Sequence, residues 1–272
     1  MSGLVYCLLL DGALLRDHAL LHSAQRAGRA LYTDLGPDAS MVGPWLWPDI
    51  QLADVGVIDL PMRHGVSEIH AAIPIDLLFA HLTRIRHLVT HDGQRYFVRY
   101  ADMRALSSLQ IALDDAQWRF LVGPITNWSH LTRDGTRRHI VDGPLPSSHS
   151  LNHIELKPRQ LAVLLDAGLP DLLSRALEEL EEPGLCPESD ASQYAQLQAA
   201  ADLVRSIGIE SFPIQRSIAR QAALHGAQAI QSEDFLRLIE GARWQDTLHL
   251  IDAWKPSQAL RRQHEKAAKQ ST

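Results

Sequence analysis

The sequence predicts an α+β fold in two parts: a lobe with a mixed sheet over residues 1–148 and an all-helical lobe over residues 149–272. In the first part, short apolar runs alternate with segments whose apolar residues recur at helical spacing, whereas after residue 156 only the helical spacing continues. Residues 143–148 are Gly-Pro-Leu-Pro-Ser-Ser, a composition typical of a linker. The first 150 residues contain no lysine. We therefore expect a domain boundary close to residue 148.

The first elements are expected to be short strands and one helix. Residues 4–10 are all apolar and are followed by an Asp-Gly pair, which predicts a buried strand. Apolar residues at helical spacing predict a helix over residues 14–28, and residues 30–33 predict a second strand. Residues 41–48 contain two prolines, which exclude a helix interior and favour an edge strand or an extended turn.

Two Asp-Gly pairs mark the later turns of this lobe. Asp92-Gly93 and Asp134-Gly135 each lie between strand-like runs, and this dipeptide supplies the positive φ angles of a tight hairpin turn. The elements expected here are, in order, a strand at residues 65–73, a helix at 75–87 opened by Pro74, a hairpin of 87–91 with 94–100, helices at 103–110 and 114–121, and a hairpin of 125–131 with 138–141.

Beyond residue 156 the pattern is helical throughout. Helices are expected at residues 159–167, 169–181, 193–207, 214–225 and 233–240, separated by Gly or Pro signals. Ser232 precedes two acidic residues and predicts the N-terminal cap of the last of these helices. The end of the chain, residues 255–272, has five basic residues and one acid, and we interpret it as a solvated helix or tail.

Composition excludes several classes of protein. Apolar residues make up 46% of the chain and the net charge is −6, which argues against a surface that binds nucleic acid or an anionic membrane. The longest apolar run, seven residues, is far too short to span a bilayer, and no secretory signal pattern surrounds it. Cys7 and Cys186 form no metal or redox motif. A protein of the cytoplasm is the resulting expectation.

No motif indicates an active site. A glycine-rich phosphate loop, a Gly-x-Ser-x-Gly elbow and the His-Glu-x-x-His pattern are all absent from the sequence. Cys7 lies inside an apolar strand and is expected to be a small core residue. Structural histidines are favoured over metal ligands, because no third ligand accompanies any spaced pair. Those pairs are His18 and His22, His87 and His91, and His149 and His153. We therefore expect no catalytic residue, no metal and no cofactor.

Five residues are candidates for contact with a partner. Trp45 and Trp47 alternate along an extended segment and so share one face, where they would anchor the core or form an interaction hot spot. Arg99, Asp102 and Arg104 closely follow the first hairpin, and an acid between two arginines suggests a local ion-pair or capping network. The structural interpretation is favoured for both groups, and a partner contact is the alternative.

The order of several segments carries a resemblance. The segments are Leu-Leu-Leu-Asp-Gly-Ala at residues 8–13, Leu31-Tyr32, Val-Gly-Pro-Trp-Leu at 42–46, residues 81–88, Asp92-Gly93, residues 96–106 and residues 120–124. In this order they resemble the N-terminal domain of the type VI secretion effector chaperones, also called adaptors, over about residues 4–130. The family usually has an Asp-Pro-Arg step. Here Asp102 and Arg104 match it, and Met103 replaces the proline.

This resemblance implies a function in protein binding. Members of the family are not known as enzymes: each binds a particular toxic effector in the bacterial cytoplasm and helps to load it onto the valine-glycine repeat spike protein. For this chain the resemblance implies an effector-chaperone domain over residues 1–148. The implied partners are a cognate secreted effector and the spike protein, with no nucleic acid and no membrane.

Two rival functions come from other classes. A hydrolase would require at least two of His64, His70, His81 and Asp102 to converge in one deep pocket with shifted pKa values. A regulatory module would use the basic tail after Trp254 to bind nucleic acid, with binding that weakens steeply with salt.

Overall fold

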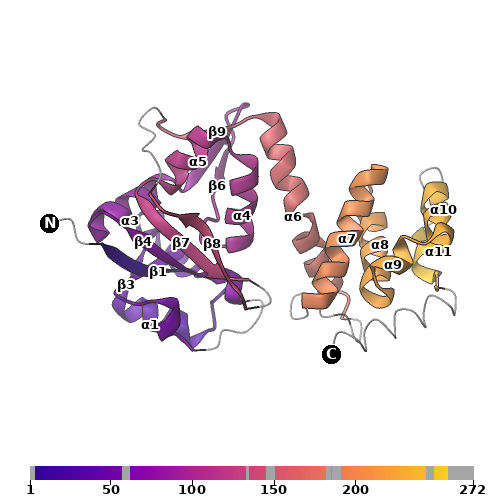
Figure 1. The fold of residues 1–272 in the computed structure, drawn as a ribbon, viewed down its shortest axis with the longest axis horizontal. Coiled ribbons are helices and arrows are strands. Elements are labelled where there is room, and N and C mark those ends of the chain that lie inside the picture. The colour runs from indigo at the N-terminus through magenta and orange to yellow at the C-terminus, as the bar shows by residue number, and fades with distance from the viewer. Residues whose placement is uncertain are drawn as a thin grey trace. The chain divides into compact units, whose positions relative to one another are not determined.

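The chain folds into two compact units. The computed structural model describes residues 4–56, 62–132, 135–144, 151–181, 185, 191–242 and 248–256. One unit comprises Met1–Gly168 and the other Leu169–Thr272 (Figure 1). Strands occur in the first unit, and the described part of the second is helical, which confirms the predicted α+β class. None of the helices in the described ranges is long and apolar enough to cross a membrane.

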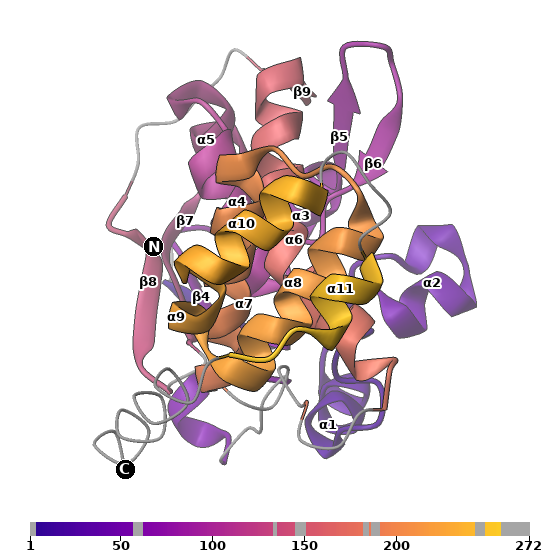
Figure 2. The same ribbon diagram turned by 90° about the vertical axis from the view of Figure 1, so that its right-hand side faces the viewer.

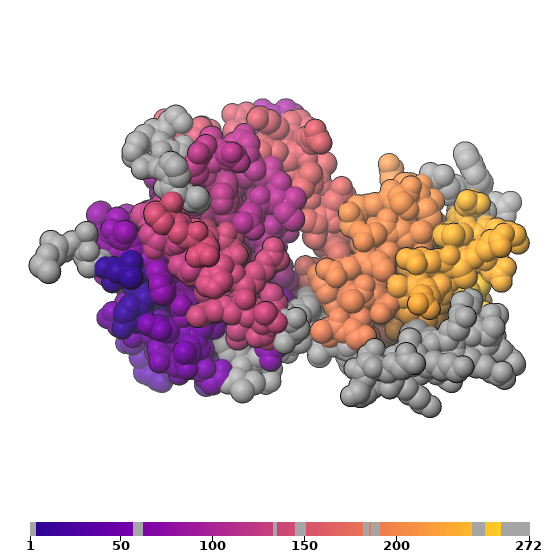
Figure 3. All heavy atoms as spheres, viewed as in Figure 1, coloured from indigo at the N-terminus to yellow at the C-terminus, as the bar shows by residue number. Residues whose placement is uncertain are grey.

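A six-stranded antiparallel sheet is the centre of the first unit. Its strand order is β2-β3-β1-β4-β7-β8. The strands are β1 (Val5–Asp11), β2 (Arg29–Ala30), β3 (Pro44–Pro48), β4 (Val66–Ala71), β7 (Ile125–Leu131) and β8 (Arg137–Asp142). In the space-filling view, the pink atoms around β7 and β8 form much of the visible surface of this unit (Figure 3).

Both faces of this sheet are covered, which explains the unbroken apolar run of β1. Successive side chains of a strand point to opposite faces. Cys7 and Leu9 pack in one hydrophobic core, Leu8 and Leu10 pack in another, and all four are fully buried. A strand with one solvated face would alternate apolar and polar residues instead. The run at residues 4–10 is therefore the sign of a central strand.

A second, smaller sheet has the strand order β6-β5-β9. β5 (His87–Thr90) and β6 (Arg95–Phe97) form the predicted antiparallel hairpin, with a φ of 83° at Gly93 in the turn. β9 (Ile154–Leu156), which the sequence did not predict, pairs with β5 in parallel. The first unit therefore contains both kinds of strand pairing, as a mixed-sheet lobe requires.

Helices of the first unit cover the sheets. They are α1 (Ala19–Ala27), α2 (Pro37–Val42), α3 (Ile75–Arg84), α4 (Met103–Ala112) and α5 (Asp115–Val122), with 3₁₀ helices η1 (Thr33–Leu35), η2 (Leu52–Asp54) and η3 (Met62–Gly65). α1 begins later than predicted, because residues 12–17 form turns. The Asp11 carboxylate holds these turns by accepting the backbone N–H groups of Ala13 and Leu14, each at 3.0 Å.

β3 corrects the prediction of an edge strand. It pairs with both β1 and β2, so it lies inside the sheet, and Met41 and Val42 belong to helix α2. The extended conformation itself was predicted correctly. Pro44 and Pro48 fit an interior strand because they are its first and last residues, where a missing N–H group disturbs the ladder least.

The second unit consists of packed helices. They are the later part of α6 (Pro158–Glu178), with α7 (Ala191–Ile207), α8 (Phe212–His225), α9 (Ala227–Ile230), α10 (Glu233–Ala242) and α11 (Leu248–Ala253). Two helices predicted at residues 159–167 and 169–181 are one continuous helix with Pro170 inside it, so that division was wrong. Ser232 caps α10 as predicted: its hydroxyl lies 3.4 Å from the Phe235 backbone N–H.

The first unit extends further along the chain than residue 148. β9 and the first turns of α6 belong to it, because Ile154 and Leu156 are buried in its core and Leu161 and Leu164 pack against that core. The predicted boundary itself falls among residues 145–150. These residues, together with Cys186, His149, Asp134 and residues 257–272 of the basic tail, lie outside the described part of the chain.

Candidate functional site

Three of the candidate residues form one ion-pair network where the loop after β6 leads into α4: Arg99 and Asp102 lie in the loop, and Arg104 lies in the first turn of α4. The Asp102 carboxylate caps α4 by accepting the Arg104 backbone N–H at 3.1 Å, and it also accepts Nε and Nη2 of Arg104 at 3.0 and 2.9 Å. Nη2 of Arg99 lies 3.5 Å from Asp102 and 3.1 Å from Oδ2 of Asp11. The ion-pair and capping interpretation is confirmed. Asp11 is a fourth member of this network that the sequence did not reveal.

Close backbone packing places Asp11 beside this loop. Asp11 ends β1 and stands opposite Pro44 in the register with β3. The N–H of Gly12 donates to the carbonyl oxygen of Gly43 at 3.1 Å, and a Cβ on Gly12 would lie only 2.5 Å from that oxygen. Glycine at position 12 therefore permits the approach of the two strand ends. The Asp-Gly, Gly-Pro-Trp and Asp-x-Arg segments that carried the resemblance meet at this place.

The network holds a buried charge. Burial acts to raise the pKa of Asp102, but the hydrogen bond and charge of Arg104 and the charge of Arg99 outweigh it and hold that pKa below its usual range. Asp102 is therefore ionised at neutral pH, and each charge in the network faces an opposite one. Buried charges without such partners would be strongly destabilising.

Arg99 is the member of the network that reaches the surface. Half of its side chain is exposed, whereas the side chains of Asp11 and Asp102 are 7% and 5% exposed. Both contacts to these carboxylates use Nη2 of Arg99. Asp11 and Asp102 therefore hold in place a guanidinium that remains half exposed.

Trp45 and Trp47 share one face of β3, as predicted. Both are half-buried and pack against the core that contains Leu8 and Leu10. Nε1 of Trp45 donates to the carbonyl oxygen of Ser40 at 3.0 Å, so its polar atom already has a protein partner. The two rings are therefore core residues. They pack against the hydrophobic cluster of Leu8 and Leu10 and do not belong to the ion-pair network.

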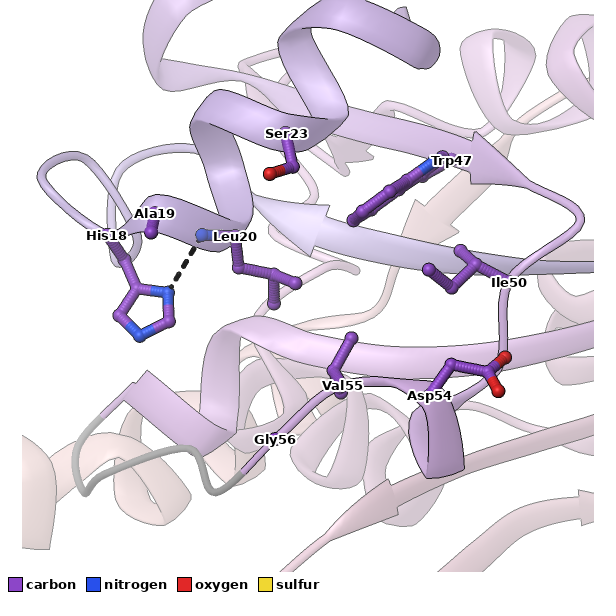
Figure 4. Close-up of a pocket in the computed structure, with 9 residues that line it drawn as sticks. All are labelled: His18, Ala19, Leu20, Ser23, Trp47, Ile50, Asp54, Val55 and Gly56. Carbon is purple, nitrogen blue, oxygen red and sulfur yellow. Dashed lines mark hydrogen bonds between the residues drawn. The ribbon is translucent and has the colours of Figure 1, made fainter.

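Trp47 also lines a shallow cavity of about 270 Å³. Figure 4 shows the side chains of Leu20, Trp47, Ile50 and Val55 turned toward a common space, with His18 at its rim. His18 is the N-terminal cap of α1, because its Nδ1 accepts the backbone N–H of Leu20 at 3.1 Å. That role explains His18 without a metal.

An exposed apolar patch lies beside the ion-pair network. We define it by four large side chains that are each at least 41% exposed: Leu35, Met41, Val42 and Phe97. Tyr96, which is 46% exposed, points to the other face of β6. The four side chains come from η1, α2 and β6, segments that the sequence did not connect. The sequence did contain one signal, the adjacent aromatic residues Tyr96 and Phe97. Adjacent residues on a strand point to opposite faces, so both rings are buried only if both faces of the strand are covered.

Tyr32 joins the two halves of this patch. Its ring lies 5.7 Å from the Phe97 ring, and its carbonyl oxygen accepts the hydroxyl of Ser40 in α2. Burial raises the pKa of Tyr32 to about 12, so its hydroxyl stays protonated. Arg86 next to β5 makes a bidentate pair with Asp34 of η1, at 2.6 and 2.7 Å. Contacts through Tyr32 and Arg86 therefore join the hairpin to the η1–α2 segment; Figure 2 labels α2 and the two strands of the hairpin.

Three of the four residues of the hydrolase hypothesis are engaged separately, and the fourth, His64, is buried in η3. Nε2 of His81 lies 2.9 Å from the carbonyl oxygen of Leu121, and Nε2 of His70 lies 3.0 Å from the carboxylate of Glu68. Asp102 is bound to its arginines. These three side chains are not hydrogen-bonded to one another, so their described contacts give no catalytic constellation.

Cys7 and the spaced histidines were the remaining chemical candidates. Cys7 is buried, and burial together with the charges of Asp49 and Glu68 raises the pKa of its thiol to about 12, which opposes a role as nucleophile. Within the described ranges, no group of three His, Cys, Asp or Glu side chains could hold a metal ion.

Comparison with known proteins gives one match. Residues 6–119 match the family described as a domain of unknown function, DUF4123. Searches of curated proteins and of solved structures gave no match. The chain therefore contains a DUF4123 domain, and this domain includes all five candidate residues, the ion-pair network and the exposed apolar patch.

Proposed function

We propose that this protein is a type VI secretion effector chaperone, or adaptor, which binds a cognate toxic effector in the bacterial cytoplasm and helps to load it onto the valine-glycine repeat spike protein. The observation that carries the proposal is the DUF4123 domain at residues 6–119, a domain associated with effector adaptors of this system. The order of the matching segments and the place where they meet both support it.

The surface of the domain suits a protein partner. The exposed apolar patch would be covered when an effector binds, and a standard interface covers roughly 800 Å² on each partner. Arg99 stands near it with a guanidinium held in place by Asp11 and Asp102. Arginine is common in such interfaces because its planar group makes several contacts at modest desolvation cost.

The five candidate residues take different parts in this proposal. Arg99 and Trp47 present atoms to the effector, because one is half-exposed and the other lines an open cavity. Asp102 and Arg104 position Arg99, and Trp45 supports β3 from the core side.

Co-expression with the protein encoded immediately downstream tests the proposal. We expect that protein to co-purify with the chain by affinity capture and size-exclusion chromatography, and to become more soluble. Arg99→Gln should weaken the complex about tenfold, as expected for an arginine near the centre of an interface. Arg119→Gln is the matched control, since within the described ranges the side chain of Arg119 bonds only to its own helix, at the carbonyl oxygen of Asp115. A downstream protein that neither co-purifies nor gains solubility would overturn the proposal.

A further inference from the structure

β6 is an edge strand whose outer side is exposed. It ends the sheet order β6-β5-β9, and all three of its residues, Arg95, Tyr96 and Phe97, are exposed. Figure 2 shows β6 on the side of the hairpin away from β9. An edge of this kind offers backbone N–H and C=O groups to another extended chain.

The hydrogen-bond ladder of the hairpin identifies the residues that face outward. Thr90 N–H donates to the Gln94 carbonyl, and Val98 N–H donates to the Arg86 carbonyl, each at 2.9 Å. In an antiparallel pair, every second residue of a strand hydrogen-bonds to the partner strand. Gln94 and Val98 are such residues, so Tyr96 between them, opposite Leu88, is one as well. The N–H and C=O groups of Arg95 and Phe97 therefore point away from β5, two residues apart, as a further strand requires.

The side chains of β6 favour particular residues in a strand that binds to it. Arg95 and Phe97 share one face, where Phe97 contacts Tyr32 and His87 yet remains 54% exposed. The guanidinium of Arg95 lies 3.3 Å from Nδ1 of His87, and no carboxylate pairs with it in the described part of the chain. A ligand strand with an acidic residue beside Arg95 and an apolar one against Phe97 would match both.

β8, an edge strand of the six-stranded sheet, has a different set of exposed side chains. β8 presents charged residues along its exposed half, and its Arg137 is already paired with the buried carboxylate of Glu68 at 2.8 Å. Charged edge strands commonly block pairing with other chains. β6 differs because it combines exposed aromatic rings with an arginine, Arg95, that has no acidic partner among the residues that the structure describes.

We propose that β6 binds an extended segment of the effector as an added strand, with an acidic side chain next to Arg95 and an apolar side chain against Phe97. This inference rests on the proposed function and specifies how the partner is held. The acid argues for a different protein over a second copy of this chain, because β6 contains no acidic residue to pair with Arg95. Pairing by strand addition is a general mode of peptide recognition.

Two variants at one position separate the backbone contribution from the charge. Arg95→Gln removes the charge and keeps the N–H group, whereas Arg95→Pro removes both, and a proline is compatible with an outward-facing edge position. We expect Arg95→Pro to weaken binding of the co-purified effector about two- to tenfold more than Arg95→Gln, the equivalent of one backbone hydrogen bond. Circular dichroism and thermal melting of both variants check that the hairpin remains folded.

Hydrogen exchange of the wild-type chain gives an independent measurement. In the free protein, the amides of Arg95 and Phe97 should exchange fast and that of Tyr96 slowly. In the complex with the downstream protein, all three should exchange slowly. This result, with the difference between the two variants, would support strand addition.

The other outcomes each contradict the inference in a distinct way. If the wild-type chain binds the effector but both variants bind equally and the outer amides stay unprotected, strand addition is wrong and the proposed function stands. If those amides become protected in the chain alone as it dimerises, β6 pairs with a second copy. If the wild-type chain forms no complex, the proposed function fails and this inference fails with it.

Discussion

At the scale of single residues, His81 shows how burial fixes a protonation state. Nε2 lies 2.9 Å from the Leu121 carbonyl oxygen, which can only accept, so Nε2 carries the proton of the neutral ring. A second proton would have to be placed on Nδ1 in a buried site. Burial lowers the pKa of His81 to about 4, against 6.5 for the free side chain, and the charge of Arg84 acts in the same direction.

The first prediction concerns stability in acid. Because the folded pKa of His81 is depressed, the unfolded state binds a proton first, so stability should fall as pH decreases from about 6.5 to about 4. Between pH 7.5 and pH 5, wild type should lose on the order of 2 kcal/mol more than His81→Gln in urea unfolding. Part of the slope remains in the variant, since burial lowers the pKa of His130 as well. Equal slopes for wild type and variant would refute the assignment.

A second prediction concerns Asp102, which has two roles at once. Asp102→Ala removes both the cap of α4 and the acid that holds Arg104, and should cost on the order of 3 kcal/mol in unfolding free energy. Asp102→Asn keeps a capping side chain and should be about 1 kcal/mol less harmful. Guanidinium chloride melts of the two variants measure the difference. Indistinguishable stabilities would mean that capping adds nothing to the ion pair.

At the scale of elements, the end of α5 depends on a close contact. Gly123 follows the helix with a φ of 50°, and a Cβ there would lie well inside van der Waals contact with the buried ring of His81. Gly93 in the hairpin turn also has a positive φ, of 83°, but nothing lies within 4 Å of its Cβ position. Both glycines therefore adopt a positive φ, but only at Gly123 would a side chain collide with a neighbour.

The third prediction uses this pair. Gly93→Ala should cost about 1 kcal/mol, because an L-residue is strained at positive φ. Gly123→Ala should cost at least about 2 kcal/mol more, since the added methyl overpacks the site of His81. Thermal unfolding of both variants provides the comparison, and equal losses would show that the ring moves aside without penalty.

The elements predicted from sequence were those with local signals. Both hairpins follow from Asp-Gly pairs, and α4 and α5 follow from apolar spacing and capping residues. β9 was missed because three residues carry no periodicity and depend on β5, far earlier in the chain. The division of α6 was wrong because Gly168 was taken as a boundary, although the helix continues through it and buries Leu173 and Leu177.

At the scale of the whole molecule, the site also has parts with local sequence signals and parts that depend on contacts between distant segments. Arg99, Asp102 and Arg104 lie within six residues of one another, so their network could be predicted. Asp11 joins it across 88 positions, through the meeting of two strand ends. The exposed apolar patch likewise unites segments of η1, α2 and β6 that only the folded chain brings together. Surfaces made from distant segments carry no local sequence pattern.

The most direct test of the proposed function is the mass of the co-expressed complex, measured by light scattering during size-exclusion chromatography. The account predicts a stable species whose mass is that of the downstream protein plus at least one chain of 30.3 kDa. Arg99→Gln should shift this species toward its free components, and Arg119→Gln should not. Elution of the wild-type chain at its own mass alone, with the downstream protein absent from its peak, would contradict the account.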